Sequence, residues 1–306
     1  MSWLIFVAAA VLFDSARIYA DNYSSDVYFK GRGAVSQKLF FTYALGLVGV
    51  VLLAVTGFDF AGLTVQGAAL FLLSGFLSSI AGIPYYRALE LDNSTNLGIF
   101  IQLAPILYLI LGWLFLGDTI SPLQLVAFLI ILSAPLLIFF TTGKRSRLVK
   151  LRAIACAFLY VLIAVIANLI FVKENSTDVN FVTEMALLFL GKSLGNFFIL
   201  LVKPSWRRRF QSVVRSSKKK VFRPLLSSLA FSLVKDFTYR AALVLAPTAA
   251  IASAISDSSE PIVIFFMGIL LTLLWPKLGR EKLSRKSILV HLIATILVVI
   301  GVLLIR

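Results

Sequence analysis

The stretch YRALELDNSTNLGIFIQLAP, residues 86–105, decides the fold, because a second version follows as YRAALVLAPTAAIASAISDSSEP, residues 239–261. Each version opens on Tyr-Arg-Ala, passes a short break and enters an apolar run that reaches a proline, Pro105 or Pro261. An acidic residue and one more apolar segment follow each copy. A repeat that ends both halves of an apolar chain predicts two related helix bundles that face each other across one site.

The composition excludes a soluble domain. Hydrophobic residues make up 60% of the chain and charged residues 14%, whereas soluble domains carry about 25% charged residues. The apolar runs are about 20 residues long, enough to cross a hydrocarbon core of about 30 Å, and they do not alternate with polar residues. Because helices satisfy their own backbone groups in lipid, we expect an all-α integral membrane protein.

We expect ten transmembrane helices, arranged as two inverted five-helix repeats. The expected ranges are 3–20, 38–57, 64–90, 94–116, 122–141, 151–172, 179–202, 224–245, 247–275 and 286–305. The first repeat occupies 1–141, a basic linker 142–150 and the second repeat 151–306. We interpret the apolar start as the first spanning helix rather than a cleaved signal, since no basic segment precedes it. Pro105 and Pro261 lie inside expected spans, where we expect kinks that act as hinges.

Charge indicates how the chain is oriented. Most of the 29 basic residues fall in four loop segments, near 30–38, 144–152, 203–223 and 277–286. The positive-inside rule places these loops in the cytoplasm of a multi-pass protein of the cell membrane, and with ten spans it places both termini outside. We expect the loops to meet anionic lipid headgroups. Nucleic acid is not expected as a partner, because the basic segment lies in a membrane chain and fits an interfacial helix.

Ionisable residues inside spans are the candidates for function, because each is costly in hydrocarbon. The charged candidates are Asp14, Lys192, Lys235, Asp236, Asp257 and Glu260, and the polar ones are Gln102 and Asn168. Asp14 and Asn168 fall in the first helix of each half, which makes both candidates to line a central cavity.

Asp257 and Glu260 are three residues apart, and therefore lie on one face of a helix near mid-membrane. Glu260 directly precedes Pro261, whereas Pro105 follows an alanine. Two interpretations stay open for this pair of carboxylates. They form a structural ion pair with Lys235 or Lys192, or they form a substrate or proton site while the lysines bind an anionic group of the substrate.

The layout resembles the EamA-type family of the drug/metabolite transporter superfamily. The residues that carry the resemblance are the Tyr-Arg-Ala segments, the prolines, and the acidic residues Asp118 and Glu281. The chain departs from the family at Asp118, where a Glu is usual, and in the long basic segment before Glu281. The resemblance implies a secondary transporter of a small polar or amphipathic metabolite, such as an amino acid or a nucleotide-linked compound. It also implies that both termini lie inside, opposite to the charge rule.

The sequence offers no catalytic apparatus. There is one His, one Cys and no Gly-rich nucleotide loop, so we expect no enzyme, no cofactor and no metal site. The alternative to a transporter is a non-transport polytopic membrane scaffold or a lipid-binding subunit. An enzyme that acts on lipid-linked substrates would need clustered acid and base groups at one interface. The substrate, the coupling ion, the direction of transport and the oligomeric state do not follow from the sequence.

Overall fold

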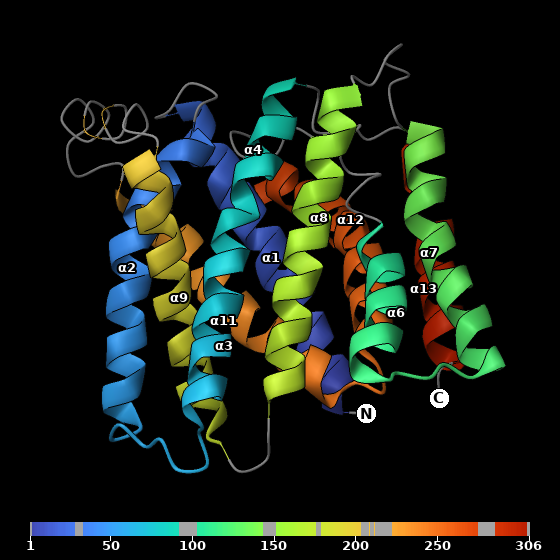
Figure 1. Ribbon diagram of the computed structural model, residues 1–306. Helices are drawn as coiled ribbons and strands as arrows, with labels where there is room; N and C mark the ends of the chain where they lie inside the picture. Colours follow the sequence, from blue (N-terminus) through green and yellow to red (C-terminus); the bar gives the residue numbers. More distant parts are fainter. Residues whose placement is uncertain are drawn as a thin grey trace. The chain divides into compact units, whose positions relative to one another are not determined.

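The regular elements in the described part of the chain are all α-helices. The computed structural model describes residues 2–27, 33–91, 103–142, 151–175, 179–202, 208, 211, 222–274 and 285–304 (Figure 1). Within these ranges the regular elements are α-helices, and no strand occurs. This confirms the expected all-α class.

The helices fall close to the apolar ranges of the sequence. The first half contains α1 (Ser2–Val27), α2 (Gly33–Val55), α3 (Val65–Ile80), α4 (Gly82–Leu91), α6 (Ala104–Leu116) and α7 (Pro122–Thr142). The second half contains α8 (Leu151–Glu174), α9 (Phe181–Val202), α11 (Phe222–Leu245), α12 (Ala249–Leu274) and α13 (Arg285–Leu304). α3 and α4 follow each other across Ala81 and together fill the third expected span.

Helix starts follow from local hydrogen bonds. Thr64 caps α3 by accepting a bond from the Gly67 amide at 2.9 Å. At α7 the Gln124 amide donates to the Ser121 hydroxyl at 3.2 Å, and the Ser121 amide donates to the Gln124 side chain at 3.0 Å. Such reciprocal bonds satisfy backbone N–H groups that have no partner inside the helix. The predicted start of α7 at the Ser121-Pro122 step is confirmed.

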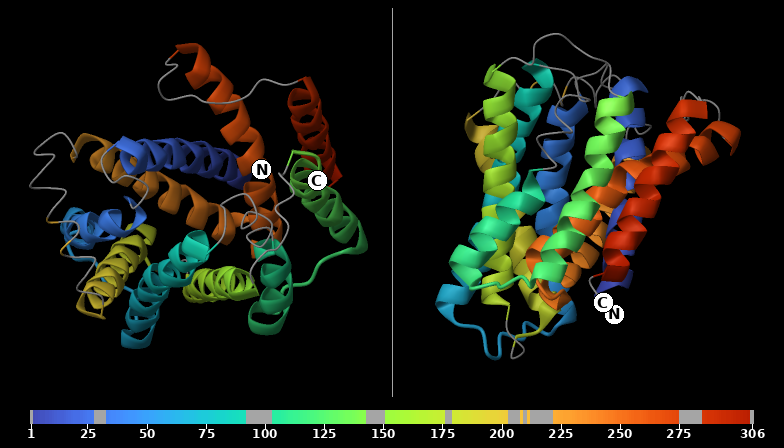
Figure 2. Two further views of the ribbon diagram at one scale, coloured as in Figure 1. Left: turned by 90° about the horizontal axis from the view of Figure 1, so that it is seen from above. Right: turned by 90° about the vertical axis from the view of Figure 1, so that its right-hand side faces the viewer.

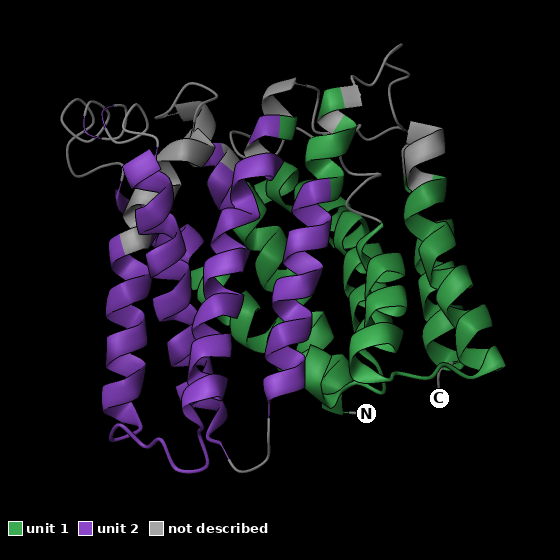
Figure 3. Cartoon of the chain, in the orientation of Figure 1, with its two compact units in different colours: residues 1–19, 88–158, 230–306 green, residues 20–87, 159–229 purple. Residues whose placement is uncertain are grey.

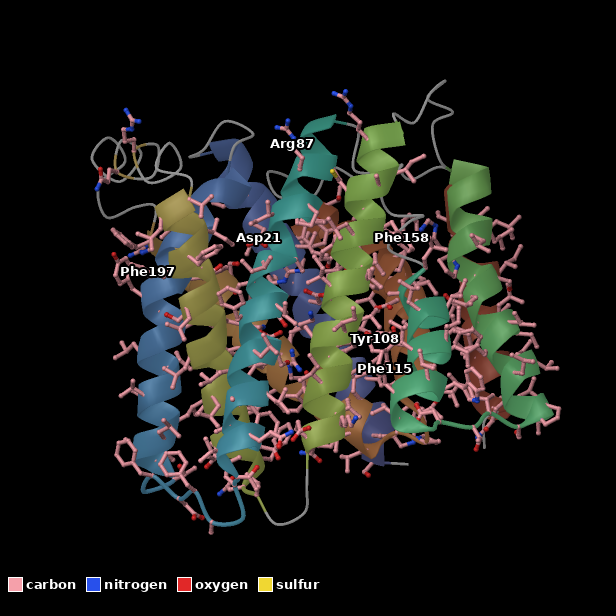
Figure 4. All side chains as sticks on the ribbon, in the orientation of Figure 1. Asp21, Arg87, Tyr108, Phe115, Phe158 and Phe197 are labelled. Atoms are coloured by element: carbon pink, nitrogen blue, oxygen red, sulfur yellow. The ribbon has the colours of Figure 1, made fainter. Side chains whose placement is uncertain are left out.

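Five helical segments in the described ranges are long and apolar enough to cross a membrane, judged by length and composition. They are Ser2–Asp21, Val65–Tyr85, Ile154–Glu174, Phe181–Val202 and Ala249–Leu274. Large apolar side chains are exposed on several helices, such as Phe197 on α9 at 49% (Figure 4). Exposed apolar faces on long helices fit a membrane-embedded protein. The number of ten spans stays a prediction.

The chain divides into two compact units, and each unit takes segments from both sequence halves (Figure 3). Unit 1 comprises Met1–Tyr19, Ala88–Phe158 and Ala230–Arg306, and unit 2 comprises Ala20–Arg87 and Leu159–Leu229. The units therefore differ from the predicted repeats 1–141 and 151–306, which are defined by sequence similarity and not by compactness.

Unit 2 is built on α9, which packs against α2 and α3 with very close backbones. A Cβ added at Gly191 of α9 would lie 2.1 Å from the Leu72 carbonyl oxygen, and one added at Gly75 of α3 would lie 2.0 Å from the Leu188 carbonyl oxygen. Only glycine permits such contact, and in lipid close packing is what holds helices together. We call Gly75, Gly191 and Gly195, with the backbone they touch, the glycine seam.

Serines of α3 tie the same unit together. Ser74 donates to the Ala167 carbonyl of α8 at 2.6 Å, and Ser79 donates to the Lys192 carbonyl of α9 at 2.8 Å. Both serines are buried. These two serines of α3 therefore join helices of unit 2.

Unit 1 pairs α6 with α12 and α7 with α13. Both views of Figure 2 show α7 and α13 side by side. A core of Ala134, Ile262, Ala294 and Val298 joins α7, α12 and α13. Pro261 lies inside α12, which agrees with its expected position, and the kink there stays a prediction. Pro105 differs from the expectation, because it lies in the first turn of α6, where the missing N–H removes no helical hydrogen bond.

Candidate functional site

The candidate site lies within unit 1, where three long helices carry charged side chains in their interior. α1 contributes Asp14 and Arg17, and α11 contributes Lys235, Asp236 and Arg240. α12 contributes Asp257 and Glu260. We call these seven residues the charged cluster. All seven side chains are buried or half-buried.

The tightest contact of the charged cluster is on α1. The Arg17 Nε atom donates to the Asp14 Oδ1 atom at 2.6 Å, one helical turn away. Lys235 of α11 approaches the other oxygen of Asp14, with 3.7 Å between Nζ and Oδ2. Asp14 is 14% exposed in its side chain, so its charge needs these cations. One carboxylate thus links α1 to α11.

The carboxylates of α12 are held differently. The Ser253 hydroxyl donates to the Asp257 Oδ2 atom at 2.7 Å, one turn away on the same helix. Glu260 makes no hydrogen bond or ion pair with another residue of the described ranges. Its charged neighbours are Asp14, Asp257, Arg17 and Lys235. Glu260 is therefore a half-buried carboxyl group that has charges nearby but no direct contact with a cation.

Tyrosines border the charged cluster on the side of α6. Tyr108 of α6 is 1% exposed, and its hydroxyl lies 3.5 Å from the hydroxyl of Tyr239 on α11 (Figure 4). The Lys235 Nζ atom lies 5.3 Å from the centre of the Tyr239 ring, within the range of a cation–π contact. Tyr19 of α1 donates to the carbonyl of Ile264 at 2.8 Å, three residues beyond Pro261 of α12. Hydroxyl groups therefore connect α1 to α12 and α6 to α11 around the charges.

The charges of the cluster do not balance. Asp14, Asp236, Asp257 and Glu260 are four acids, whereas Arg17, Lys235 and Arg240 are three bases. One carboxyl group thus has no counter-charge of its own among these residues. In a low-dielectric interior an unbalanced charge is costly, so a proton or a cationic ligand would complete the cluster.

The sequence-predicted site residues divide between the units. Asp14, Lys235, Asp236, Asp257 and Glu260 come together in unit 1. Asn168 and Lys192 lie in unit 2, on α8 and α9, and Gln102 lies outside the described residues. Lys235 lies within ion-pair distance of Asp14. One interpretation left open by the sequence paired Asp257 and Glu260 with Lys235 or Lys192, and in the described residues no ion pair joins Lys235 to either carboxylate.

Lys192 and Asn168 have surroundings of their own in unit 2. The Lys192 Nζ atom lies 5.8 Å from the centre of the Phe189 ring on the same helix. Asn168 is half-buried on α8, next to the Ala167 carbonyl that binds Ser74. Within unit 2 these two residues are part of the packed helices around the glycine seam.

Sequence reasoning passed over Ser253, Tyr19 and Tyr108. Ser253 could have been found from its spacing, because it lies four residues before Asp257 and so on the same helix face. Tyr19 and Tyr108 could not, because their partners are 245 and 131 residues away in the sequence. Contacts of this separation depend on which helices are neighbours.

Asp118 lies outside the spans, between α6 and α7, and reaches the start of α12. Burial raises the pKa of its carboxyl above the usual value, while the N–H of Ala249 at the first residue of α12 acts in the opposite direction. A carboxylate at a helix N-terminus stabilises the helix. The acidic residue of the first repeat thus contacts the helix that carries Asp257 and Glu260.

No protein-family model matches this chain, and no curated protein sequence is similar to it. A solved structure named "Crystal structure of protein" is similar over 99% of this chain and 96% of its own length, with 16% identity and a TM-score of 0.70. At this identity the likeness concerns the fold alone. The function must therefore be argued from the charged cluster.

Proposed function

We propose that this chain is a secondary transporter of the EamA type, which moves a small polar or amphipathic metabolite by alternating access and couples transport to protons. The charged cluster carries the proposal. Seven ionisable residues inside the helices of a membrane chain are expensive, and such residues usually mark substrate or ion pathways. The resemblance stated for the sequence supplies the class of substrate.

Helix pairing supports the inverted repeat that alternating access needs. In unit 1, α6 contacts α12 and α7 contacts α13, and in unit 2, α2 contacts α9. In the expected order these are the fourth, fifth and second helices of the two halves. Contact between equivalent helices is what a pseudo-two-fold axis produces. A solved structure is similar to nearly the whole chain, which supports the interpretation that both halves belong to one fold.

We propose Glu260 as the proton-carrying group. It has no direct cationic partner in the described ranges, it belongs to the cluster with an excess carboxyl, and it precedes the proline of α12. A group that binds and releases a proton as access alternates couples transport to the proton gradient. Pro261 next to it leaves α12 with a point where the helix can bend.

The test uses purified protein in sealed vesicles. A thermal-shift screen against metabolite pools first finds a ligand, because ligands that bind the folded state raise its apparent stability. Glu260→Gln keeps the volume of the side chain and imitates the protonated form. We expect this variant to lose transport driven by a pH gradient while substrate exchange, which needs no net proton movement, survives.

Gradient-driven transport at the wild-type rate in Glu260→Gln would show that Glu260 does not carry the proton. The scaffold or lipid-binding alternative predicts a different result. A scaffold should tolerate neutralisation of Lys235, Asp257 and Glu260 together, provided that the bundle still folds. A folded triple variant with unchanged cellular function would favour that alternative.

A further inference from the structure

The cations of the charged cluster differ in how firmly they are held. Arg17 contacts Asp14 at 2.6 Å, three residues away on the same helix. Lys235 lies at 3.7 Å from the same carboxylate, a loose ion pair that joins two helices. Since Arg17 already neutralises Asp14, Lys235 can leave this carboxylate with a smaller loss than Arg17 can.

Other carboxylates lie near Lys235. Its charged neighbours are Asp14 and Arg17 on α1, Asp236 on α11 and Glu260 on α12. Asp257 of α12 also interacts electrostatically with Lys235. Of these acids, Glu260 makes no ion pair or hydrogen bond in the described ranges. A lysine has a flexible four-carbon stem, so its ammonium group can move between acceptors while its backbone stays in place.

We propose that Lys235 is a transferable counter-ion, which rests on Asp14 of α1 while Glu260 is neutral and moves to Glu260 of α12 when Glu260 becomes charged. In the structure Lys235 occupies the first of these two positions, against Asp14 and over the ring of Tyr239. In the second state Asp14 keeps Arg17, and the excess carboxylate of the cluster gains a cation.

The transfer has a mechanical result. In the first state Lys235 ties α11 to α1, and in the second it ties α11 to α12. Whether Glu260 carries a proton thereby determines whether Lys235 of α11 pairs with α1 or with α12. This role rests on the proposed function for its purpose, since alternating access needs helices that change partners, but its test requires neither a substrate nor transport.

The test measures the thermal midpoint of the purified protein at the acid and alkaline ends of the pH range in which it stays folded. Asp14→Asn removes the carboxylate that pairs with Lys235 in the structure. At the acid end we expect it to lower the midpoint strongly, because Arg17 and Lys235 both lose their partner. At the alkaline end we expect a smaller loss, because Lys235 has moved to Glu260.

The decisive variant is Glu260→Gln, because it removes the second carboxylate with which Lys235 could pair. In this background we expect the Asp14→Asn loss to be the same at both ends of the pH range. Asp59→Asn is the matched control, an exposed loop carboxylate bonded to the Ala61 amide. We expect the pH dependence of its effect to be unchanged by Glu260→Gln.

An Asp14→Asn loss that is equal at both ends in the wild-type background would overturn the proposal, because Lys235 would then be fixed on Asp14. A pH-dependent loss that persists in Glu260→Gln would also overturn it, because another group would be responsible. If Asp14→Asn fails to fold, Lys235→Gln replaces it in the same two backgrounds. In the wild-type background we then expect the larger loss at the alkaline end, where charged Glu260 loses its cation, and in Glu260→Gln we expect equal losses at both ends. Loss of coupled transport in Glu260→Gln with a pH-independent Asp14→Asn effect would retain the proposed function and reject the transfer.

Discussion

Two sets of helices, α3 with α9 in unit 2 and α1 with α11 and α12 in unit 1, are joined by different kinds of contact. In unit 2, α3 and α9 touch backbone to backbone through the glycine seam. In unit 1, α1 meets α11 and α12 through long side chains, by the Asp14–Lys235 and Tyr19–Ile264 contacts. Backbone contact through glycine allows little displacement, whereas long side chains can exchange partners. We therefore expect α3 and α9 to keep their positions, and we expect α1, α11 and α12 to be the helices that can rearrange.

The glycine seam gives the largest expected effect. We expect Gly191→Ala to lower the free energy of unfolding by about 3 kcal/mol or more, because the added methyl group would press on the backbone of Leu72 and force the helices apart. The measurement is the thermal midpoint and the monodisperse yield in detergent. Gly112→Ala of unit 1 is the control, since its methyl group meets only the movable end of Asp118 at 2.9 Å. Equal losses in both variants would remove the contrast between the units.

Removal of one cation from the charged cluster should cost less. We expect Arg17→Gln to lower the free energy of unfolding by about 1–2 kcal/mol, because Asp14 loses its nearest partner but keeps Lys235. Thermal or denaturant unfolding in detergent measures it. Arg152→Gln, an exposed position at the start of α8, is the matched control and should be nearly neutral. A loss as large as that of Gly191→Ala would show that unit 1 is no more tolerant than the seam.

The proline of α12 tests rearrangement rather than stability. Pro261→Ala restores a backbone N–H inside the helix, so we expect the variant to fold at least as well as the wild type but to transport several-fold more slowly. Transport in vesicles gives the rate. Pro135→Ala in α7 makes the same change in a helix without cluster residues. If both variants transport at the same rate as the wild type, the proline of α12 serves packing only.

The smallest effect should come from one hydroxyl group. Ser253→Ala removes the bond to Asp257, and we expect a loss of about 1 kcal/mol in the free energy of unfolding. Ser258→Ala is matched to it, because the buried Ser258 hydroxyl has no hydrogen-bond partner in the described ranges. We expect this second change to be neutral or slightly stabilising. If Ser258→Ala lowered the free energy of unfolding more than Ser253→Ala does, the Ser253 hydrogen bond would not be what holds Asp257.

The sequence predicted the helices well because apolar length is a local property. The expected ranges 122–141 and 151–172 lie within a residue or two of α7 and α8. Local pattern also placed Asp257 and Glu260 on one helix. It failed for Pro105, which was expected inside a longer helix and lies in the first turn of α6. A proline is compatible with either place, and the sequence around it does not distinguish them.

The partners of the charged residues could not be predicted from the sequence. A pair of Lys235 or Lys192 with Asp257 and Glu260 was one of two interpretations left open, and the structure places Lys235 at ion-pair distance from Asp14, which lies 221 positions earlier. Several acids in different helices are chemically equivalent partners for one lysine, so the choice depends on which helices adjoin. The close contact at Gly191 could not be predicted for a related reason. A glycine in a membrane helix is common, and only the opposite backbone shows that Gly191 has no space for a methyl group.

The glycine seam also constrains the order in which this protein can be made. Gly75 and Gly191 are separated by roughly 120 residues, which take roughly 6–24 s to synthesise at about 5–20 residues per second. During that interval α2 and α3 are in or near the membrane without the helix that closes them. Their small-residue faces lack their final partner until α9 emerges, so other membrane helices can contact them during this interval. A chain that stalls before residue 191 would expose the same faces, which gives quality-control proteases a surface by which to recognise the incomplete product.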